Sequence, residues 1–369
     1  MLWFLWACSA PVDTPSFEPP RPGVDRSAVV YDLLRLEQRL RRDCAGEDGA
    51  AWFDQQVAPL DNLLETIRER LNKQGISDWS QAPLKEARYA LKIIDSTMYQ
   101  HGFVICVPAR HLSQTLQPRL FSLTEGGGYA QIGEEVCTIR SAPSYRLSAL
   151  LDQEKIRPLD CDIGAMMYLS VGDLPIEAVE VPGHTFVRWT LPDGSVFNWD
   201  VNQGREFSDD DYRTGRTGEN LPFDTETEKA GRYLQGRTHK ELLDYFYGAV
   251  FQEVEHQSCL DIALSDYATG TVEGGAFEHM VAWRIATHVP YAAYAEHAVS
   301  MASQAARLEA TCTRWSVLSC AYAAAGDFER AMTIERIYIS ETSPRIQPFA
   351  AGRTCYEPEL AASMGCVTR

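Results

Sequence analysis

Cys161, His184 and Asp200 are three residues whose side chains could perform chemistry together. A cysteine thiolate is a strong nucleophile, a histidine can take up and return its proton, and an aspartate can orient the histidine and stabilise its cation. These are the parts of a site for thiol acyl transfer, in which a thioester forms on the cysteine. The surrounding elements must bring the three side chains into contact.

Cys161 stands where the sequence predicts the start of a helix. Asp160 is suited to cap this helix, and apolar residues follow at helical spacing up to Leu169. In the first helical turn, the positive end of the helix dipole favours the thiolate of Cys161, whereas the carboxylates of Asp160 and Asp162 oppose it. The thiol therefore needs a base to activate it.

A β-hairpin is predicted to carry that base. A strand over 176–181 and a sharp turn at Pro182 and Gly183 lead into His184. Two further strands, over 185–191 and 195–200, flank Pro192-Asp193-Gly194, which is typical of a three-residue loop with glycine in the left-handed position. Such a loop places Leu191 opposite Ser195 and so fixes the register.

This register divides the hairpin side chains between two faces. One face is predicted to be core, with Val187 opposite Trp199 and Trp189 opposite Phe197. The other face carries His184, Phe186, Arg188, Asn198 and Asp200. Because Asp200 is diagonal to His184, their side chains can form a hydrogen bond. A two-residue loop would shift the register by one and place them on opposite faces.

Four segments of the chain resemble a known superfamily. Their order and spacing resemble the transglutaminase-like, papain-related superfamily, and more closely its second core family, whose bacterial members carry a C-terminal tetratricopeptide-like region. The resemblance covers about residues 85 to 215 and the C-terminal tail. The segments are Ile94–Phe103 (IDSTMYQHGF), Leu150–Cys161 (LLDQEKIRPLDC) with the apolar helix after it, Leu174–Arg188 (LPIEAVEVPGHTFVR) and Asp200–Gly204 (DVNQG).

This resemblance implies roles for the three residues: Cys161 is the nucleophile, His184 the general base and acid, and Asp200 the residue that orients the imidazole. It also implies a peptide or protein substrate and no cofactor or metal. Two positions depart from the family pattern, because Leu-Asp precedes Cys161 where glycine and a small or polar residue are commoner, and Gln203 stands where glycine is usual. Since members of this family are not all enzymes, the alternative is a catalytically inactive scaffold that binds protein partners through its C-terminal helices.

Less specific interpretations of these residues stay open at this point. Cys161 could be a buried or disulfide-bonded cysteine, and His184 with Asp200 could belong to an exposed polar strand face. A metal site is a third alternative, although the candidate ligands lack paired spacing. Arg188 is expected to pair with Asp200, or else to attract an acidic substrate.

The fold class predicted from these patterns is α+β. We expect a possible lipoprotein signal and linker over 1–24, a helical layer over 25–84, a transglutaminase-like core over 85–238 and a helical domain over 239–369. Within the layer, helices are predicted over 25–44, with Asp25 as its cap, and over 52–72. A third, over 83–99, leads into the core.

Two segments of the core are predicted to be loops. The glycine-containing stretch over 121–140 is expected to be a mobile loop, and 208–237 a long surface connection.

The C-terminal helices show a weak internal repeat. The stretch from Trp315 to Ala331 resembles one tetratricopeptide repeat, and a degenerate second copy contains Trp283 and Ala298. The alternative is a generic helical hairpin in which Gly326 ends the first helix.

Composition limits the partners of the chain. A net charge of -17 over 369 residues repels phosphate backbones and anionic lipids, so a nucleic-acid partner is not expected. Contact with a membrane is expected only through Cys8, because Leu5-Trp6-Ala7-Cys8 resembles a bacterial lipobox, the alternative being a plain apolar terminus.

The cysteines bear on the compartment. Setting aside Cys8 and Cys161 leaves eight of the ten cysteines, enough for up to four disulfides in an oxidising compartment. We therefore expect a cell-envelope, periplasmic location, with the cytoplasm as the alternative.

Overall fold

The computed structural model describes most of the chain between Arg26 and Ile339. The described ranges are 26–46, 50–105, 157–159, 161–220, 222–223, 228, 231, 233–253, 257–270, 275–287, 293–308 and 312–339. The predicted anchor and linker over 1–24, the loop over 121–140 and the capping residue Asp160 lie outside these ranges.

Helices form the N-terminal layer, as the apolar spacing predicts. They are α1 (Val29–Ala45), α2 (Ala50–Asn72), the 3-10 turn η1 (Trp79–Gln81) and α3 (Leu84–Gln100). The predicted capping residue Asp25 lies outside the described residues; α1 begins at Val29, after Ala28, which makes no side-chain capping bond. Val29 and Val30 are buried, so packing of the first turn sets this boundary rather than a cap.

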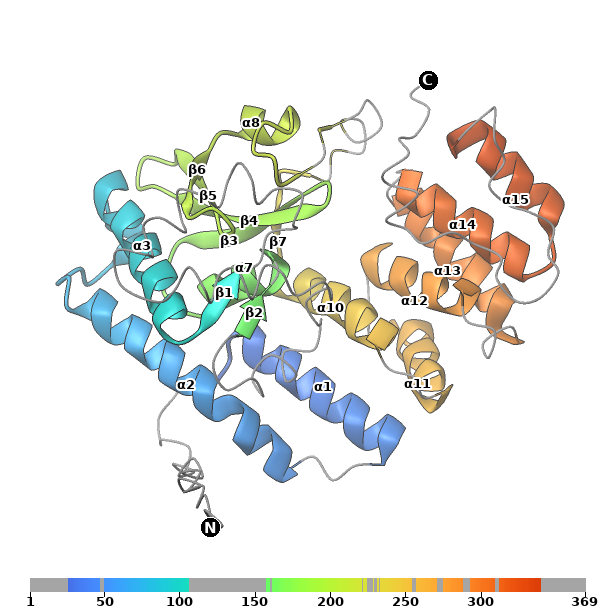
Figure 1. Ribbon diagram of the computed structural model, residues 1–369, viewed down its shortest axis with the longest axis horizontal. Coiled ribbons are helices and arrows are strands. Elements are labelled where there is room, and N and C mark those ends of the chain that lie inside the picture. Colours follow the sequence, from blue (N-terminus) through green and yellow to red (C-terminus); the bar gives the residue numbers. More distant parts are fainter. Residues whose placement is uncertain are drawn as a thin grey trace, which may run out of the picture.

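A five-stranded antiparallel sheet lies above α7 in Figure 1, with α3 on one side and the C-terminal helices on the other. Its strand order is β6-β5-β4-β3-β7. The strands are β3 (Ile176–Val181), β4 (His184–Thr190), β5 (Val196–Asp200), β6 (Arg205–Phe207) and β7 (Gly236–Arg237). A parallel pair, β1 (Phe103–Ile105) and β2 (Arg157–Leu159), precedes helix α7 (Cys161–Leu169), which packs against β3 and β4. This mixture of helices and a small antiparallel sheet is an α+β fold, as predicted.

The hairpin register is confirmed. Val187 lies opposite Trp199 and Trp189 opposite Phe197. Gly194 has φ of 80° and so occupies the left-handed position that the three-residue loop requires. Trp189 is fully buried and packs edge-to-face on Trp79 of η1, with ring centroids 6.3 Å apart. This face of the sheet therefore belongs to the main core, as predicted.

The second face of the sheet is also buried. A separate apolar cluster forms there, in which Phe186 of β4 packs with Tyr212 and Leu234. Tyr212 belongs to α8 (Asp209–Arg213), so the prediction of a plain surface connection over 208–237 is wrong. The segment is polar in composition, yet its few apolar side chains cover the sheet.

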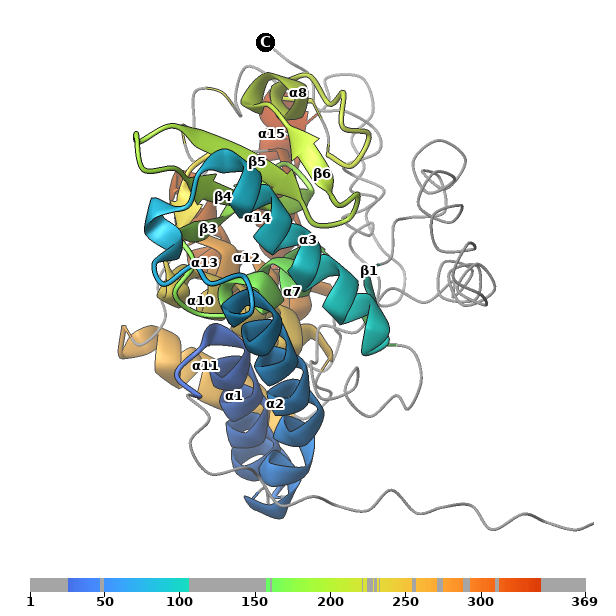
Figure 2. The same ribbon diagram turned by 90° about the vertical axis from the view of Figure 1, so that its left-hand side faces the viewer.

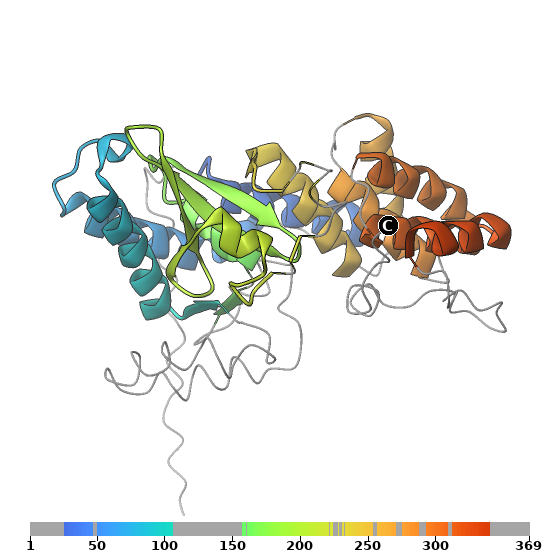
Figure 3. The same ribbon diagram turned by 90° about the horizontal axis from the view of Figure 1, so that it is seen from above.

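The C-terminal part is helical and lies beside the sheet (Figure 3). Its elements are α10 (His239–Glu253), α11 (Gln257–Ala268), α12 (Gly275–Thr287), α13 (Ala295–Leu308), α14 (Cys312–Ala324), α15 (Phe328–Ile334) and the π-helical turn η5 (Glu335–Ile339). Successive helices from α12 to α15 pack on one another, and Gly326, with φ of 83°, follows α14. The likeness to a tetratricopeptide repeat and the expected domain divisions stay predictions.

One apolar core connects these parts. It runs from α1 and α2 through α7 to α12 and α14. Figure 2 shows α1 and α2 beneath α7, with α11 beside α1. A disulfide between Cys44 and Cys259 joins the end of α1 to α11. Within the described ranges, none of the helices has the length and apolar character needed to cross a bilayer.

Candidate functional site

Cys161 is the first residue of α7, as the sequence predicts. The helix after it is anchored in the core, with Ile163 to Tyr168 buried. Cys161 itself is half-buried, and its sulfur forms no disulfide in this structure, which does not support the alternative of a disulfide-bonded cysteine. Its Sγ–H donates to Oδ1 of Asp162 at 3.8 Å.

Asp162 also connects α7 to the strand that begins with His184. The hydroxyl of Thr185 donates to the same Oδ1 atom that receives the Cys161 thiol. Asp162 follows Cys161 in the chain and Thr185 follows His184, so this bond ties together the two backbone positions that carry the thiol and the imidazole. The negative charge of Asp162 also contributes to raising the pKa of His184.

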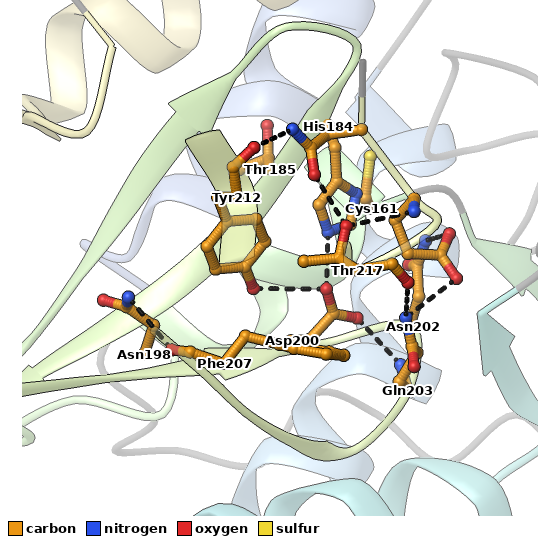
Figure 4. A network of polar contacts seen from close by, with 12 residues as sticks. Cys161, His184, Thr185, Asn198, Asp200, Asn202, Gln203, Phe207, Tyr212 and Thr217 are labelled. Carbon is orange, nitrogen blue, oxygen red and sulfur yellow. Dashed lines mark hydrogen bonds and ion pairs between the residues drawn. The ribbon is translucent and has the colours of Figure 1, made fainter. Parts of the chain in front are cut away.

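His184 and Asp200 form the hydrogen bond that the register predicts (Figure 4). His184 is the first residue of β4 and Asp200 the last of β5, and 2.8 Å separates Nε2 from Oδ2. Their side chains are 1% and 0% exposed, which overturns the alternative of an exposed polar strand face. Water cannot compete for this contact.

Electrostatics favour the ion pair in this contact. Burial pushes the pKa of His184 down, but the charge and hydrogen bond of Asp200 outweigh it, and the pKa is raised. Burial likewise pushes the pKa of Asp200 up, but the charge and hydrogen bond of His184 outweigh it, and the pKa is lowered. Two more donors assist, since the Gln203 N–H reaches Oδ1 at 2.9 Å and the Tyr212 hydroxyl reaches Oδ2 at 3.2 Å.

Glu219 is a second acidic group beside the pair. Burial raises the pKa of Glu219, and the like charge of Asp200 adds to this. Its carboxyl accepts hydrogen bonds from Asn202 Nδ2 at 3.1 Å and Gln203 Nε2 at 3.3 Å. Glu219 therefore holds the turn that supplies the Gln203 N–H to Asp200.

Arg188 does not pair with Asp200, which corrects the sequence prediction. Its guanidinium donates to Asn198 Oδ1 at 2.9 Å, to the Leu234 carbonyl at 2.8 Å and to Asp209 Oδ1 at 2.8 Å. The segment over 208–237, which covers this face of the sheet and is called the covering segment below, supplies Leu234 and Asp209. The sequence analysis had not placed them on this face. Because the Arg188 side chain is only 9% exposed, it is poorly placed to attract an acidic substrate, which was the other interpretation.

Sequence reasoning missed Tyr212, Glu219 and the Thr185–Asp162 contact. A signal for α8 was present, because Ser208 and Asp211 have capping-box spacing and form both reciprocal bonds. Nothing in the local pattern indicates that Glu219 reaches the turn after β5. In the described part of the chain, no group of three or more His, Cys, Asp or Glu side chains is arranged to hold a metal ion.

Comparison with known proteins adds no relative. No protein-family model matches the chain, and neither a curated protein sequence nor a solved structure shows significant similarity to it.

Proposed function

We propose that this protein is a thiol-dependent acyl-transfer enzyme acting on amide bonds of a peptide or protein, with Cys161 as nucleophile, His184 as general base and acid, and Asp200 as the orienting carboxylate. The observation that carries the proposal is the fully buried His184–Asp200 contact of 2.8 Å. The next residue along the strand, Thr185, bonds to Asp162 and so ties the strand of His184 to the helix of Cys161. The active centre needs no cofactor.

The first step forms a thioester. Because Nε2 of His184 is bonded to Asp200, Nδ1 is the ring nitrogen that takes the proton from Cys161 Sγ. The thiolate then attacks the substrate carbonyl carbon, and a tetrahedral intermediate forms. As the carbon–nitrogen bond breaks, the imidazolium returns its proton to the leaving amine, and the acyl group stays on Sγ as a thioester.

The second step releases the acyl group. Water or an amine gives a proton to Nδ1 of His184 and attacks the thioester carbonyl. When the carbon–sulfur bond breaks, the proton passes to Sγ and the Cys161 thiol is restored. Water gives hydrolysis, the reaction of a peptidase or amidase, whereas an amine gives a transglutaminase-like product.

A papain-like or transglutaminase-like core is the finer fold that we propose. Its support is the packing of α7, with Cys161 at its first residue, against β3 and β4 of a small antiparallel sheet. The neighbouring strand β5 then carries Asp200 at its end.

A non-catalytic scaffold is the competing proposal, and the Asp162 carboxylate favours it. A thiol that donates to a carboxylate is stabilised in its protonated form, which opposes nucleophilic reactivity. In this case the helical region would bind a protein partner. Leu308, Phe328 and Ile337 are large exposed apolar side chains there.

The reactivity of Cys161 distinguishes the two proposals. We would measure the rate of iodoacetamide labelling at Cys161 against pH by peptide mass spectrometry. An enzyme should label rapidly below about pH 7 and lose this in His184→Ala. His239→Ala is a matched control, because His239 forms a 2.8 Å pair with Asp32 at the surface. Labelling like an ordinary thiol near pH 8.5, unchanged by His184→Ala, would overturn the enzyme proposal.

A further inference from the structure

We propose that Tyr212 is a positioning residue of this site, which holds the Asp200 carboxylate in the orientation that binds His184. This inference rests on the proposed function, since it assigns a further residue to the same centre. Tyr212 comes from α8, in the segment that covers the second face of the sheet. The sequence interpretation placed no functional residue there.

The hydroxyl of Tyr212 shares one carboxylate oxygen with the imidazole. It donates to Oδ2 of Asp200 at 3.2 Å, and His184 Nε2 contacts the same atom at 2.8 Å. The Gln203 N–H binds the other oxygen, Oδ1, at 2.9 Å. Donors on both oxygens prevent the carboxylate from rotating, and Figure 4 shows them arranged around Asp200. Because Asp200 is fully buried, water cannot replace a lost donor.

The aromatic ring of Tyr212 is itself fixed. It stacks on Phe186, with centroids 4.1 Å apart and planes 8° apart, and Phe207 packs against it edge-on at 5.9 Å. The backbone is held as well, because Asn220 Nδ2 donates to the Tyr212 carbonyl at 2.6 Å. A ring held by stacking and by its backbone can set the position of its hydroxyl, as a second support of a catalytic group must do.

The chemistry of a phenol suits this role. Burial raises the pKa of Tyr212 well above its usual value, and the Asp200 charge adds to this, so the hydroxyl stays protonated as a donor. A donor on Asp200 makes the carboxylate a weaker base, which keeps the shared proton on the imidazole of His184. It also keeps Oδ2 directed at Nε2, which leaves Nδ1 for the thiol.

The test compares Tyr212→Phe with Tyr247→Phe in the full chain. Tyr247 of α10 is a matched control, because it lies outside the site and its hydroxyl also donates to a buried carboxylate. The acceptor is Asp266 of α11, at 2.6 Å. Two quantities are measured: the labelling rate of Cys161 against pH, and the pKa of the His184 ring from nitrogen NMR of histidine-labelled protein. A merely structural role of Tyr212 would not change the pKa of His184.

We expect Tyr212→Phe to slow labelling by about tenfold, because Asp200 loses the hydrogen bond that keeps its carboxylate directed at His184. We also expect it to raise the pKa of His184, because Asp200 becomes more basic. Tyr247→Phe should change neither. If Tyr212→Phe does not fold, 3-fluorotyrosine at position 212 keeps the ring and strengthens the donor, and should lower the pKa of His184 instead.

The failures of the two proposals look different. If His184→Ala abolishes labelling while Tyr212→Phe matches the wild type in rate and in the pKa of His184, the positioning role is overturned and the enzyme proposal stands. If His184→Ala labels like the wild type, the enzyme proposal fails. The positioning role is then judged by NMR alone, and an unchanged pKa of His184 in both position-212 variants overturns it.

Discussion

The carboxylate of Asp162 accepts a hydrogen bond from the hydroxyl of Thr185 and thereby joins the start of helix α7 to the strand that begins at His184. The same oxygen accepts the thiol of Cys161 at 3.8 Å. This carboxylate thus fixes the two backbones that carry the reacting groups, yet its charge opposes a thiolate beside it. Holding the site together and activating the thiol make opposite demands on Asp162.

Asp162→Asn should raise the reactivity of Cys161. The amide oxygen can still accept from Thr185, but the negative charge that stabilises the protonated thiol is gone. We expect iodoacetamide labelling at pH 6 to be about three- to tenfold faster, since a like charge nearby disfavours the thiolate. Thr185→Val keeps the charge and removes the bond, so it should not accelerate labelling. Slower labelling in Asp162→Asn would contradict this account of the charge.

Asp200→Asn should inactivate the thiol and flatten the pH dependence of stability. The asparagine cannot stabilise the imidazolium, so we expect labelling at pH 6.5 to fall by at least about 100-fold. Asp200 has a lowered pKa, so its stabilisation is present above its unfolded value near 3.9 and lost as pH falls through the folded value. His184 has a raised pKa, so its stabilisation is present below about 6.5 and lost as pH rises through the folded value.

The two contributions therefore overlap between about pH 4 and 6.5. Urea unfolding across pH checks this, and the difference in free energy of unfolding between wild type and Asp200→Asn should be largest within that interval. Asp266→Asn provides the control, because Asp266 is a buried carboxylate that pairs with Arg39 and, among the described residues, has no histidine partner. A difference that does not vary with pH would mean that the pair is not ionised.

The hairpin shows what local sequence can determine. Pro192-Asp193-Gly194 specifies the loop, the loop specifies the register, and the register places Asp200 within reach of His184. Each step depends on residues close in the chain, so the pattern contains enough information. The helix start at Cys161 is predictable for the same reason.

The covering segment shows what local sequence cannot determine. Its partners are distant in the chain: Leu234 binds Arg188 of β4, and Tyr212 binds Asp200 of β5. A stretch rich in Asp, Thr and Gly looks like a surface loop unless the second face of the sheet is known to need a cover. For the same reason the sequence analysis paired Arg188 with Asp200. In the structure its carboxylate partner is Asp209, which the covering segment brings to 2.8 Å from the guanidinium.

Glu219→Gln should change the pH dependence of stability in the opposite sense to Asp200→Asn. The pKa of Glu219 is raised, so its stabilisation is present below the unfolded value near 4.3 and lost as pH rises through the folded value. Glutamine does not ionise, so the free energy of unfolding of the variant should rise relative to that of the wild type between pH 4 and pH 7, by up to about 1 kcal/mol. Urea unfolding at the two pH values measures this. Glu206→Gln is the control, because Glu206 forms an exposed ion pair with Arg88. Its free energy of unfolding should change little relative to the wild type between these pH values.

Replacing Cys44 and Cys259 together with alanine should destabilise the protein without altering the chemistry of Cys161. The disulfide joins residues 215 positions apart, so it restricts the unfolded chain strongly, and its loss typically costs about 2–5 kcal/mol. It lies at the α1–α11 contact, where Arg39 and Asp266 form a 2.8 Å ion pair, away from His184. We therefore expect a lower urea midpoint and unchanged Cys161 labelling below the unfolding transition.

The same disulfide bears on the compartment that we propose. A protein of the oxidising cell envelope should contain it when isolated under conditions that block thiol exchange, whereas a cytoplasmic protein should yield both cysteines reduced. Alkylation of the intact protein before and after reduction, read at the peptides of Cys44 and Cys259, decides between them. Cys161 should be alkylated in both samples, because it lies outside the Cys44–Cys259 disulfide. Recovery of Cys44 and Cys259 as thiols before reduction would exclude the envelope location.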